Sequence, residues 1–183
     1  LDLSIKILED PFIALEEMFK EATSLQFSKI KNQEHIFLPL YSVRNGEKYV
    51  PEKSGLNQWN AGGRARGMDE LYIPIPALIH KLFTKFFPPR DKPFKLLLPN
   101  KTEMSAKVCQ DNSKALMSNP NAALGQWLLR DVLNLKEGEL LTYERLQAIG
   151  LDSVVIYKVD EETYDIDFTR IGSFDDFIAS KSV

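Results

Sequence analysis

Two stretches of the sequence collect side chains that could contact a phosphate backbone or the edge of a base. In residues 42–66 they are Arg44, Asn45, Lys48, Lys53, Asn57, Gln58, Trp59, Asn60, Arg64 and Arg66, and in residues 107–114 they are Lys107, Gln110, Asp111, Asn112, Ser113 and Lys114. Arginine and lysine neutralise phosphates, amides pair with base edges in the major groove, and tryptophan can stack. The residue types alone leave two interpretations open: DNA binding, or a hairpin loop of incidental polarity that Trp59 anchors to the core.

Charge is distributed unevenly along the chain. The net charge is −3, which argues against a nucleic-acid partner at first sight. However, residues 42–66 hold five Lys/Arg against two acids, residues 78–117 hold eight against three, and residues 151–183 hold three against eight. A polyanion responds to the local field more than to net charge. The pattern therefore predicts a polarised surface, with ordinary solvated faces as the alternative.

The residues offer little for catalysis. No Asp or Glu has a lysine two positions later, as the common metal-dependent nucleases require, and neither His35 nor His80 begins a His-x-Lys motif. Two isolated histidines and one cysteine do not make a zinc site of the usual forms, and no Gly-Lys pair supports a P-loop. We expect no catalytic residues, metal or cofactor. A small hydrolase that uses Cys109 or a histidine is the distant alternative.

The sequence indicates a folded, intracellular chain. Its 183 residues suit one ample domain, or one domain with an appendage. No apolar run is long enough to cross a membrane, and the N-terminus lacks the features of a signal peptide. The single cysteine fits a reducing cytosol, and a start without methionine suggests a fragment of a longer protein.

The elements that would position the polar stretches are mostly strands. Asp10-Pro11 is typical of a helix start, and Phe12, Leu15 and Phe19 follow at helical spacing, so residues 1–34 are predicted to be a helical appendage or linker. Residues 35–183 would form the main domain.

Within the main domain, turn signals separate the expected strands and helices. Strands are expected at 36–43, before the turn Asn45-Gly46, at 70–75, at 94–99 and on both sides of residues 111–113, with a C-terminal hairpin after Gly150. Short helices are expected at 78–86, after Asn119-Pro120 and after Thr142. Strands with only short helices between them favour a β-barrel or mixed sheet with flanking helices.

The order of several motifs resembles a known family. The stretches are "SGLNQWNAGGRAR", "ELYIPIP", "FFPP", "QDNSKAL", "LGQWLL", "LTYERLQAIG" and "DSVVIYK". In combination they resemble the B3-like DNA-binding domains of type II restriction endonucleases of the BfiI and NgoFVII group, over about residues 36–170. The resemblance implies a mainly β fold, a seven-stranded B3-like DNA-binding pseudobarrel with flanking helices, which is shared with plant B3 domains.

The resemblance also implies a function and a site. Two arms would enter the major groove of double-stranded DNA, an N-arm at residues 42–66 and a C-arm at about 107–117. The residues expected at base edges are Arg44, Asn45, Lys48, Gln110, Asp111 and Asn112; those expected at phosphates and groove walls are Lys53, Asn57, Trp59, Asn60, Arg64, Arg66, Lys107 and Lys114.

Such domains follow a phospholipase-D-type nuclease domain in the full-length enzyme. We therefore expect a target-recognition domain without catalytic activity of its own, in a bacterial cytoplasmic restriction endonuclease whose upstream domain dimerises. A B3-type transcription regulator is the first alternative.

Overall fold

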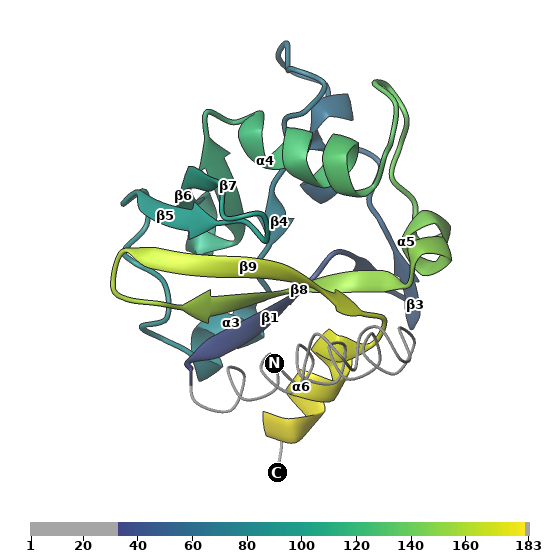
Figure 1. Cartoon of the computed structure of the whole chain (residues 1–183). Coiled ribbons are helices and arrows are strands. Elements are labelled where there is room, and N and C mark those ends of the chain that lie inside the picture. Colours follow the sequence, from purple (N-terminus) through teal and green to yellow (C-terminus); the bar gives the residue numbers. More distant parts are fainter. Residues whose placement is uncertain (1–32, 182–183) are drawn as a thin grey trace, which may run out of the picture. The chain divides into compact units, whose positions relative to one another are not determined.

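The computed structural model describes residues 33–181. The chain divides into two units, Leu1–Glu34 and His35–Val183. The helix predicted near residues 10–22 lies outside the described residues. In the second unit, seven strands of the described chain form one curved sheet, and two short strands form a separate hairpin (Figure 1).

The large sheet contains β1 (His35–Pro39), β4 (Ile73–Pro74), β5 (Phe94–Leu97), β6 (Glu103–Cys109), β7 (Ala115–Asn119), β8 (Leu151–Lys158) and β9 (Thr163–Arg170), in the order β1-β8-β9-β5-β6-β7-β4. The β5–β9 pair is parallel and the other pairs are antiparallel. The edge strands β1 and β4 lie next to each other, so the sheet is nearly closed into a barrel. The predicted mainly β, B3-like pseudobarrel class is confirmed.

The barrel interior is filled by apolar side chains that alternate along the strands. Leu71, Ile73 and Ile75 are buried, as the alternating pattern around 70–75 predicts. On β9, Tyr164 is fully buried, and its hydroxyl donates to the backbone carbonyl of Phe86 over 2.7 Å. This pairing satisfies the polar end of an aromatic ring that otherwise lies in the core.

Short helices cover the barrel: α3 (Ala77–Leu82), α4 (Ala123–Gly125) continued by the π-helical segment η3 (Gln126–Val132), α5 (Tyr143–Ile149) and α6 (Ser173–Lys181). α4 packs on β7, α5 on β8, and α6 on β1 and β8 (Figure 1). Thr142 caps α5 by accepting from the Arg145 amide over 3.3 Å, and Gly150 ends it in the left-handed region. The predicted helices after Asn119-Pro120 and Thr142 are confirmed.

Two helices differ from expectation. The predicted apolar stripe at 78–86 was wrong in part, because α3 ends at Leu82, and Leu78 and Leu82 are exposed. Only Ile79 and Phe86 of that stripe are buried. α6 was not predicted, because only a C-terminal hairpin was expected after Gly150. No helix of the described residues is long and apolar enough to cross a membrane.

Candidate nucleic-acid interface

The β2–β3 hairpin forms the tip of the predicted N-arm. β2 (Ser42–Arg44) and β3 (Glu47–Tyr49) pair antiparallel, with Arg44 opposite Glu47. Asn45 and Gly46 form the two-residue turn with positive φ angles of 54° and 82°, the conformation that Asn-Gly adopts readily. Arg44 is exposed, and its guanidinium lies 5.3 Å from the centre of the Tyr49 ring. The hairpin therefore presents Arg44 and Asn45 to solvent.

The predicted C-arm is the tight turn between β6 and β7, with η2 (Asp111–Ser113) at its tip. Gln110, Asn112 and Ser113 all have positive φ, at 65°, 57° and 55°. Such conformations are costly for residues other than glycine, and they persist only where surrounding contacts hold them. Here the Ser113 carbonyl lies 2.8 Å from Nε2 of His80, and the Lys114 carbonyl accepts from the Ile75 amide. The turn is strained and firmly held.

A series of ion pairs connects the C-arm to Arg90 and Asp91. Asp111 is 92% exposed, and its carboxylate lies 3.7 Å from the guanidinium of Arg90. Arg90 also pairs with Asp91, which in turn pairs with Lys107 over 3.2 Å. Asp111 is thus paired with an arginine that the sequence reading did not single out, although "PPRD" lies within the second basic block.

A groove of about 410 Å³ lies between the two arms. Tyr41, Ser42 and Val43 line it at the base of the hairpin, Tyr72 and residues 74–76 line its floor, and Lys114 lines it from the C-arm. Val43 is 59% exposed. The structure therefore brings the base of the N-arm and the end of the C-arm to one hollow of the surface.

The polar loop between the hairpin and β4 folds largely on itself. Its centre is the segment η1 (Gly55–Asn60). Asn57 is fully buried: its amide nitrogen donates to the carbonyls of Pro51 and Leu141, and its oxygen accepts from the Leu141 amide over 2.9 Å. The phosphate contact expected for Asn57 is therefore corrected, because a side chain without exposed surface cannot reach a phosphate.

The neighbouring polar residues also make contacts within the loop. Trp59 is partly buried and packs against the core, and Asn60 donates to the Glu52 carbonyl. Arg66 donates to the carbonyls of Ala61 and Gly62. Arg64, half exposed, pairs with Glu70 over 2.6 Å, and Lys53 is exposed. Contacts of Trp59, Asn60, Arg64, Arg66 and Lys53 with DNA stay predictions.

The end of the loop is fixed against the η3 helix. Arg130 donates from Nε to Asp69 over 2.8 Å and from its terminal nitrogens to the carbonyls of Met68, Leu135 and Lys136. Gly125 permits this close packing, because a Cβ there would lie 1.8 Å from the Asp69 carbonyl oxygen. The glycine in "LGQW" therefore has a packing role that spacing alone does not reveal.

Lys48 lies on β3, and its partly buried side chain is held against the barrel by two carboxylates. Its ammonium nitrogen lies 2.6 Å from a carboxylate oxygen of Asp175 on α6 and 3.3 Å from one of the buried Asp152 on β8. Three quarters of the side chain is shielded from solvent. The base contact expected for Lys48 stays a prediction.

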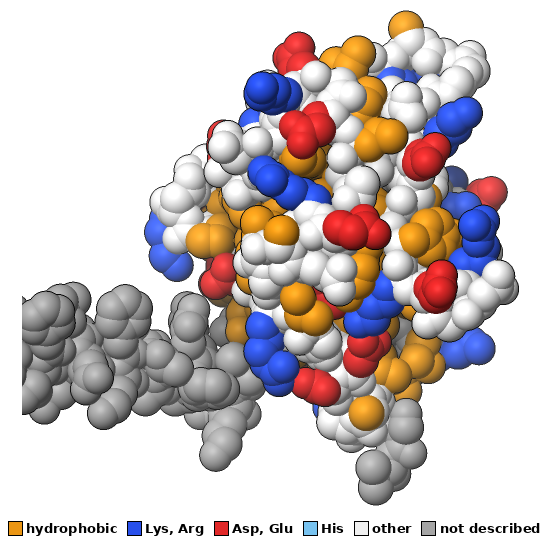
Figure 2. Space-filling model, turned by 90° about the vertical axis from the view of Figure 1, so that its right-hand side faces the viewer, with side chains coloured by type: hydrophobic (Ala, Val, Ile, Leu, Met, Phe, Trp, Pro, Cys, Tyr) orange, Lys and Arg blue, Asp and Glu red, His pale blue; other side chains and the backbone are white. Residues whose placement is uncertain are grey.

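Opposite charges are mixed on at least one face. Figure 2 shows the side on which α5 and β3 lie in Figure 1, and its Lys and Arg side chains are interspersed with Asp and Glu. No broad basic surface is visible in this view. On this face, Lys and Arg side chains therefore lie beside carboxylates and do not form a continuous basic surface.

The alternative of a hydrolase gains no support from the described residues. They contain no group of three or more His, Cys, Asp or Glu that could hold a metal. Burial raises the pKa of the Cys109 thiol, so it stays protonated at neutral pH and is a poor nucleophile.

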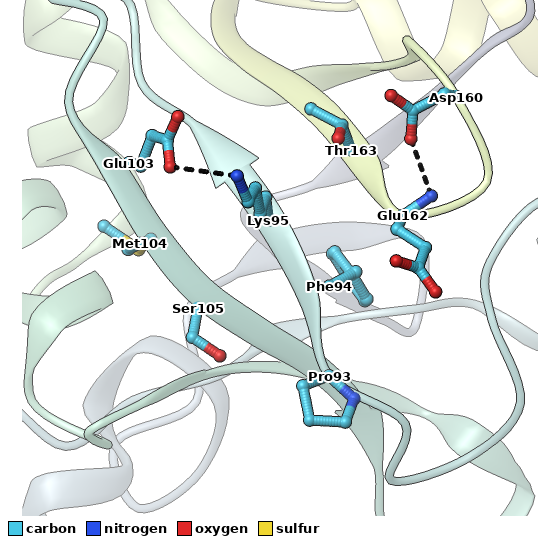
Figure 3. Close-up of a pocket in the computed structure, with 9 residues that line it drawn as sticks. All are labelled: Pro93, Phe94, Lys95, Glu103, Met104, Ser105, Asp160, Glu162 and Thr163. Atoms are coloured by element: carbon cyan, nitrogen blue, oxygen red, sulfur yellow. Dashed lines mark hydrogen bonds and ion pairs between the residues drawn. The ribbon is translucent and has the colours of Figure 1, made fainter.

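A second pocket, of about 650 Å³, lies between β5, β6 and the β8–β9 turn (Figure 3). Its Lys95 pairs with Glu103 over 3.6 Å, and Asp160 accepts from the Glu162 amide. Three carboxylates against one lysine make this pocket unfavourable for a polyanion.

A comparison with protein families identifies the chain's relatives. The family described as the NgoFVII C-terminal B3-like DNA-binding domain matches residues 18–160. The match begins earlier than the predicted domain boundary at residue 35. No curated protein matches the chain. Because the match covers most of the chain and agrees with the nearly closed β-barrel, the chain belongs to the family of NgoFVII C-terminal B3-like DNA-binding domains.

Proposed function

We propose that this chain is the target-recognition domain of a type II restriction endonuclease, and that it binds double-stranded DNA sequence-specifically with two arms in the major groove. The observation that carries the proposal is the groove that the hairpin base and Lys114 share, together with the exposure of Arg44, Asn45, Asp111 and Asn112 in the two turns. A hairpin or turn of this size fits the major groove.

The polar residues of the arm tips are proposed to read bases. Arg44 and Asn45 project from the hairpin, and Gln110, Asp111 and Asn112 occupy the strained turn. Arginine pairs with guanine, amides with adenine, and a carboxylate accepts from the amino group of cytosine. Lys53, Arg64, Lys107 and Lys114 are proposed to contact phosphates, which position the protein without reading sequence.

Selection from a random pool of duplexes tests the proposal directly. The 183-residue chain should enrich one short sequence over several rounds, and a gel shift should then show that it binds the selected duplex at least about 1,000-fold more tightly than random duplex. Equal binding of both duplexes would contradict sequence-specific recognition.

Salt dependence tests the phosphate contacts. If about five cationic groups meet phosphates, log K against log salt concentration should slope at about −4 to −5. A slope near zero would show that the basic residues are ordinary solvated surface.

Because the sequence lacks acid-x-lysine and His-x-Lys pairs, the chain should not cleave DNA with or without magnesium. Cleavage that a point mutation in this chain abolishes would contradict the assignment.

A B3-type transcription regulator would bind DNA with the same arms and no nuclease partner. The genomic sequence upstream of the codon for Leu1 distinguishes the two. A restriction endonuclease of this group predicts a phospholipase-D-type domain with His-x-Lys there, and a dimer of the full-length protein.

A further inference from the structure

The base of the β2–β3 hairpin is tied to the barrel by a cluster of charged and phenolic groups. Asp152 is fully buried, and Oδ2 of its carboxylate accepts from Lys48 over 3.3 Å and from the Tyr143 hydroxyl over 3.1 Å. Its Oδ1 accepts from the Ser153 hydroxyl and from the Gly172 amide. All these donors converge on one carboxylate at the start of β8.

Asp175 completes the cluster from α6. Its two carboxylate oxygens accept from the Tyr41 hydroxyl over 2.9 Å and from Lys48 over 2.6 Å. The Lys48 ammonium also lies 4.2 Å from the centre of the Tyr41 ring. Lys48 is therefore the one side chain of the hairpin strand β3 that links β8 to α6 in this cluster.

The electrostatics keep this lysine charged. Burial lowers the pKa of Lys48, but hydrogen bonds to Asp175 and Tyr41 and the charge of Asp152 outweigh burial, so the pKa is raised above its ordinary value. Burial also raises the pKa of the Tyr41 phenol, which remains protonated and able to donate. The Lys48 ammonium faces the carboxylates of Asp152 and Asp175, and their negative charges offset its attraction for a phosphate.

We propose that Lys48, Asp152 and Asp175 form a latch that sets the orientation of the N-arm, and that Lys48 is a positioning residue for DNA recognition. The proposal rests on the proposed function. It replaces a direct base contact of Lys48 with an indirect role: the latch holds the hairpin so that Arg44 and Asn45 face the groove. Asp175 lies beyond residue 160, where the family match ends.

Three variants test the latch on the selected duplex and on random duplex. Lys48→Met and Asp175→Asn should each weaken binding to the selected duplex about 10-fold and change binding to random duplex less than about 2-fold. The double variant should lose little more than either single variant, because both remove the same contact. Asp176→Asn is the matched control: it makes the same charge change on α6, but Asp176 pairs with exposed Arg170.

The sign of the Asp175→Asn effect distinguishes positioning from direct contact. Removing a carboxylate near DNA tightens binding on electrostatic grounds alone, whereas the latch predicts weaker binding. In addition, Lys48→Met should leave the salt slope unchanged, but loss of a direct phosphate contact would flatten it by about 0.9. A flattened slope together with tighter binding by Asp175→Asn would overturn the latch and assign Lys48 to DNA.

Amide hydrogen exchange tests the latch without DNA. In Lys48→Met and Asp175→Asn, exchange in residues 42–49 should accelerate at least about fivefold while core strands β8 and β9 stay protected. Unchanged exchange in the hairpin, equal to that of Asp176→Asn, would overturn the proposal. If the wild-type chain selects no duplex, the proposed function fails, and the exchange result still decides whether the latch exists.

Discussion

The polar loop and the C-arm turn have similar compositions but use their polar groups differently. In the loop, Asn57, Asn60 and Arg66 hydrogen-bond to backbone carbonyls of the protein itself. In the turn, Asp111 is 92% exposed and Asn112 is exposed, while backbone contacts hold the strained conformation. An abundance of amides and arginines therefore does not identify a DNA-contacting segment, because a long irregular loop needs the same groups to satisfy its own backbone.

The largest expected effect is a loss of stability, and it distinguishes the buried Asn57 from Asn60, whose hydrogen bond is exposed. Asn57→Ala should lower the free energy of unfolding by about 2–4 kcal/mol, because it leaves the buried Leu141 amide and two carbonyls without their partner. Asn60→Ala, which removes one exposed hydrogen bond, should cost less than about 1 kcal/mol. Urea denaturation measures both. Equal small losses would show that the loop is not held by Asn57 and would remove the contrast with the turn.

The next effect concerns the proposed recognition of bases by the turn. Asp111→Ala should cost about 1–3 kcal/mol in binding to the selected duplex, through loss of an acceptor for cytosine or of the carboxylate that orients Arg90. Binding to random duplex should be equal or slightly tighter, because a repulsive charge is gone. Competition gel shifts measure the ratio, with Asp131→Ala on η3 as the exposed acidic control. A lowered melting temperature with an unchanged ratio would give Asp111 a structural role.

Strain in the turn provides a third, smaller effect. Gln110 has φ 65° and ψ 172°, a region that glycine occupies almost alone. Gln110→Gly should therefore raise the free energy of unfolding by about 1 kcal/mol, after allowance for the greater freedom of glycine in the unfolded chain. It should also reduce the preference for the selected duplex. Such opposite changes in stability and recognition are expected where strain is retained for function.

Lys101→Gly is the control for this substitution, since Lys101 also has a positive φ of 66° but lies in the β5–β6 turn. It should gain stability and leave the sequence preference unchanged. Loss of stability in Gln110→Gly would mean that the Gln110 side chain, and not the backbone around it, holds the turn.

Features with local causes could be predicted from the sequence. The Asn45-Gly46 turn, the Thr142 cap and the alternation of Leu71, Ile73 and Ile75 each depend on residues within a few positions of one another. The α6 helix was missed although Asp175 and Asp176 in its first turn are a local start signal.

Features with distant partners could not be predicted. Asn57 is buried by contacts with Leu141, 84 residues away, and the carboxylates that hold Lys48 are 104 and 127 residues away. Side-chain type indicates which groups can contact DNA, but tertiary contacts decide which of them already have partners. For this reason the β2–β3 turn and the β6–β7 turn could be predicted from the sequence, whereas the partners of Asn57 and Lys48 could not.

The smallest expected effect concerns the pair that closes the polar loop. The hydrogen bond from Arg64 lowers the pKa of Glu70, and the Gly67 amide adds to this effect against the opposing effect of burial. A carboxylate with a lowered pKa stabilises the fold above its unfolded pKa, and this contribution is lost as the pH falls through the folded value. Glu70→Gln should therefore lower the Tm by about 1–2 °C at neutral pH, and the difference should shrink as the pH falls below the unfolded pKa of about 4.3 and vanish once it is below the lowered folded pKa. Thermal melts across this range measure it, and the exposed Glu137→Gln, as control, should show no such pH-dependent difference.

The salt slope of DNA binding should not change, since Arg64 keeps its charge. A flattened slope would mean that Glu70 must hold Arg64 in place for a phosphate contact, and the loop would then share the role of the arms.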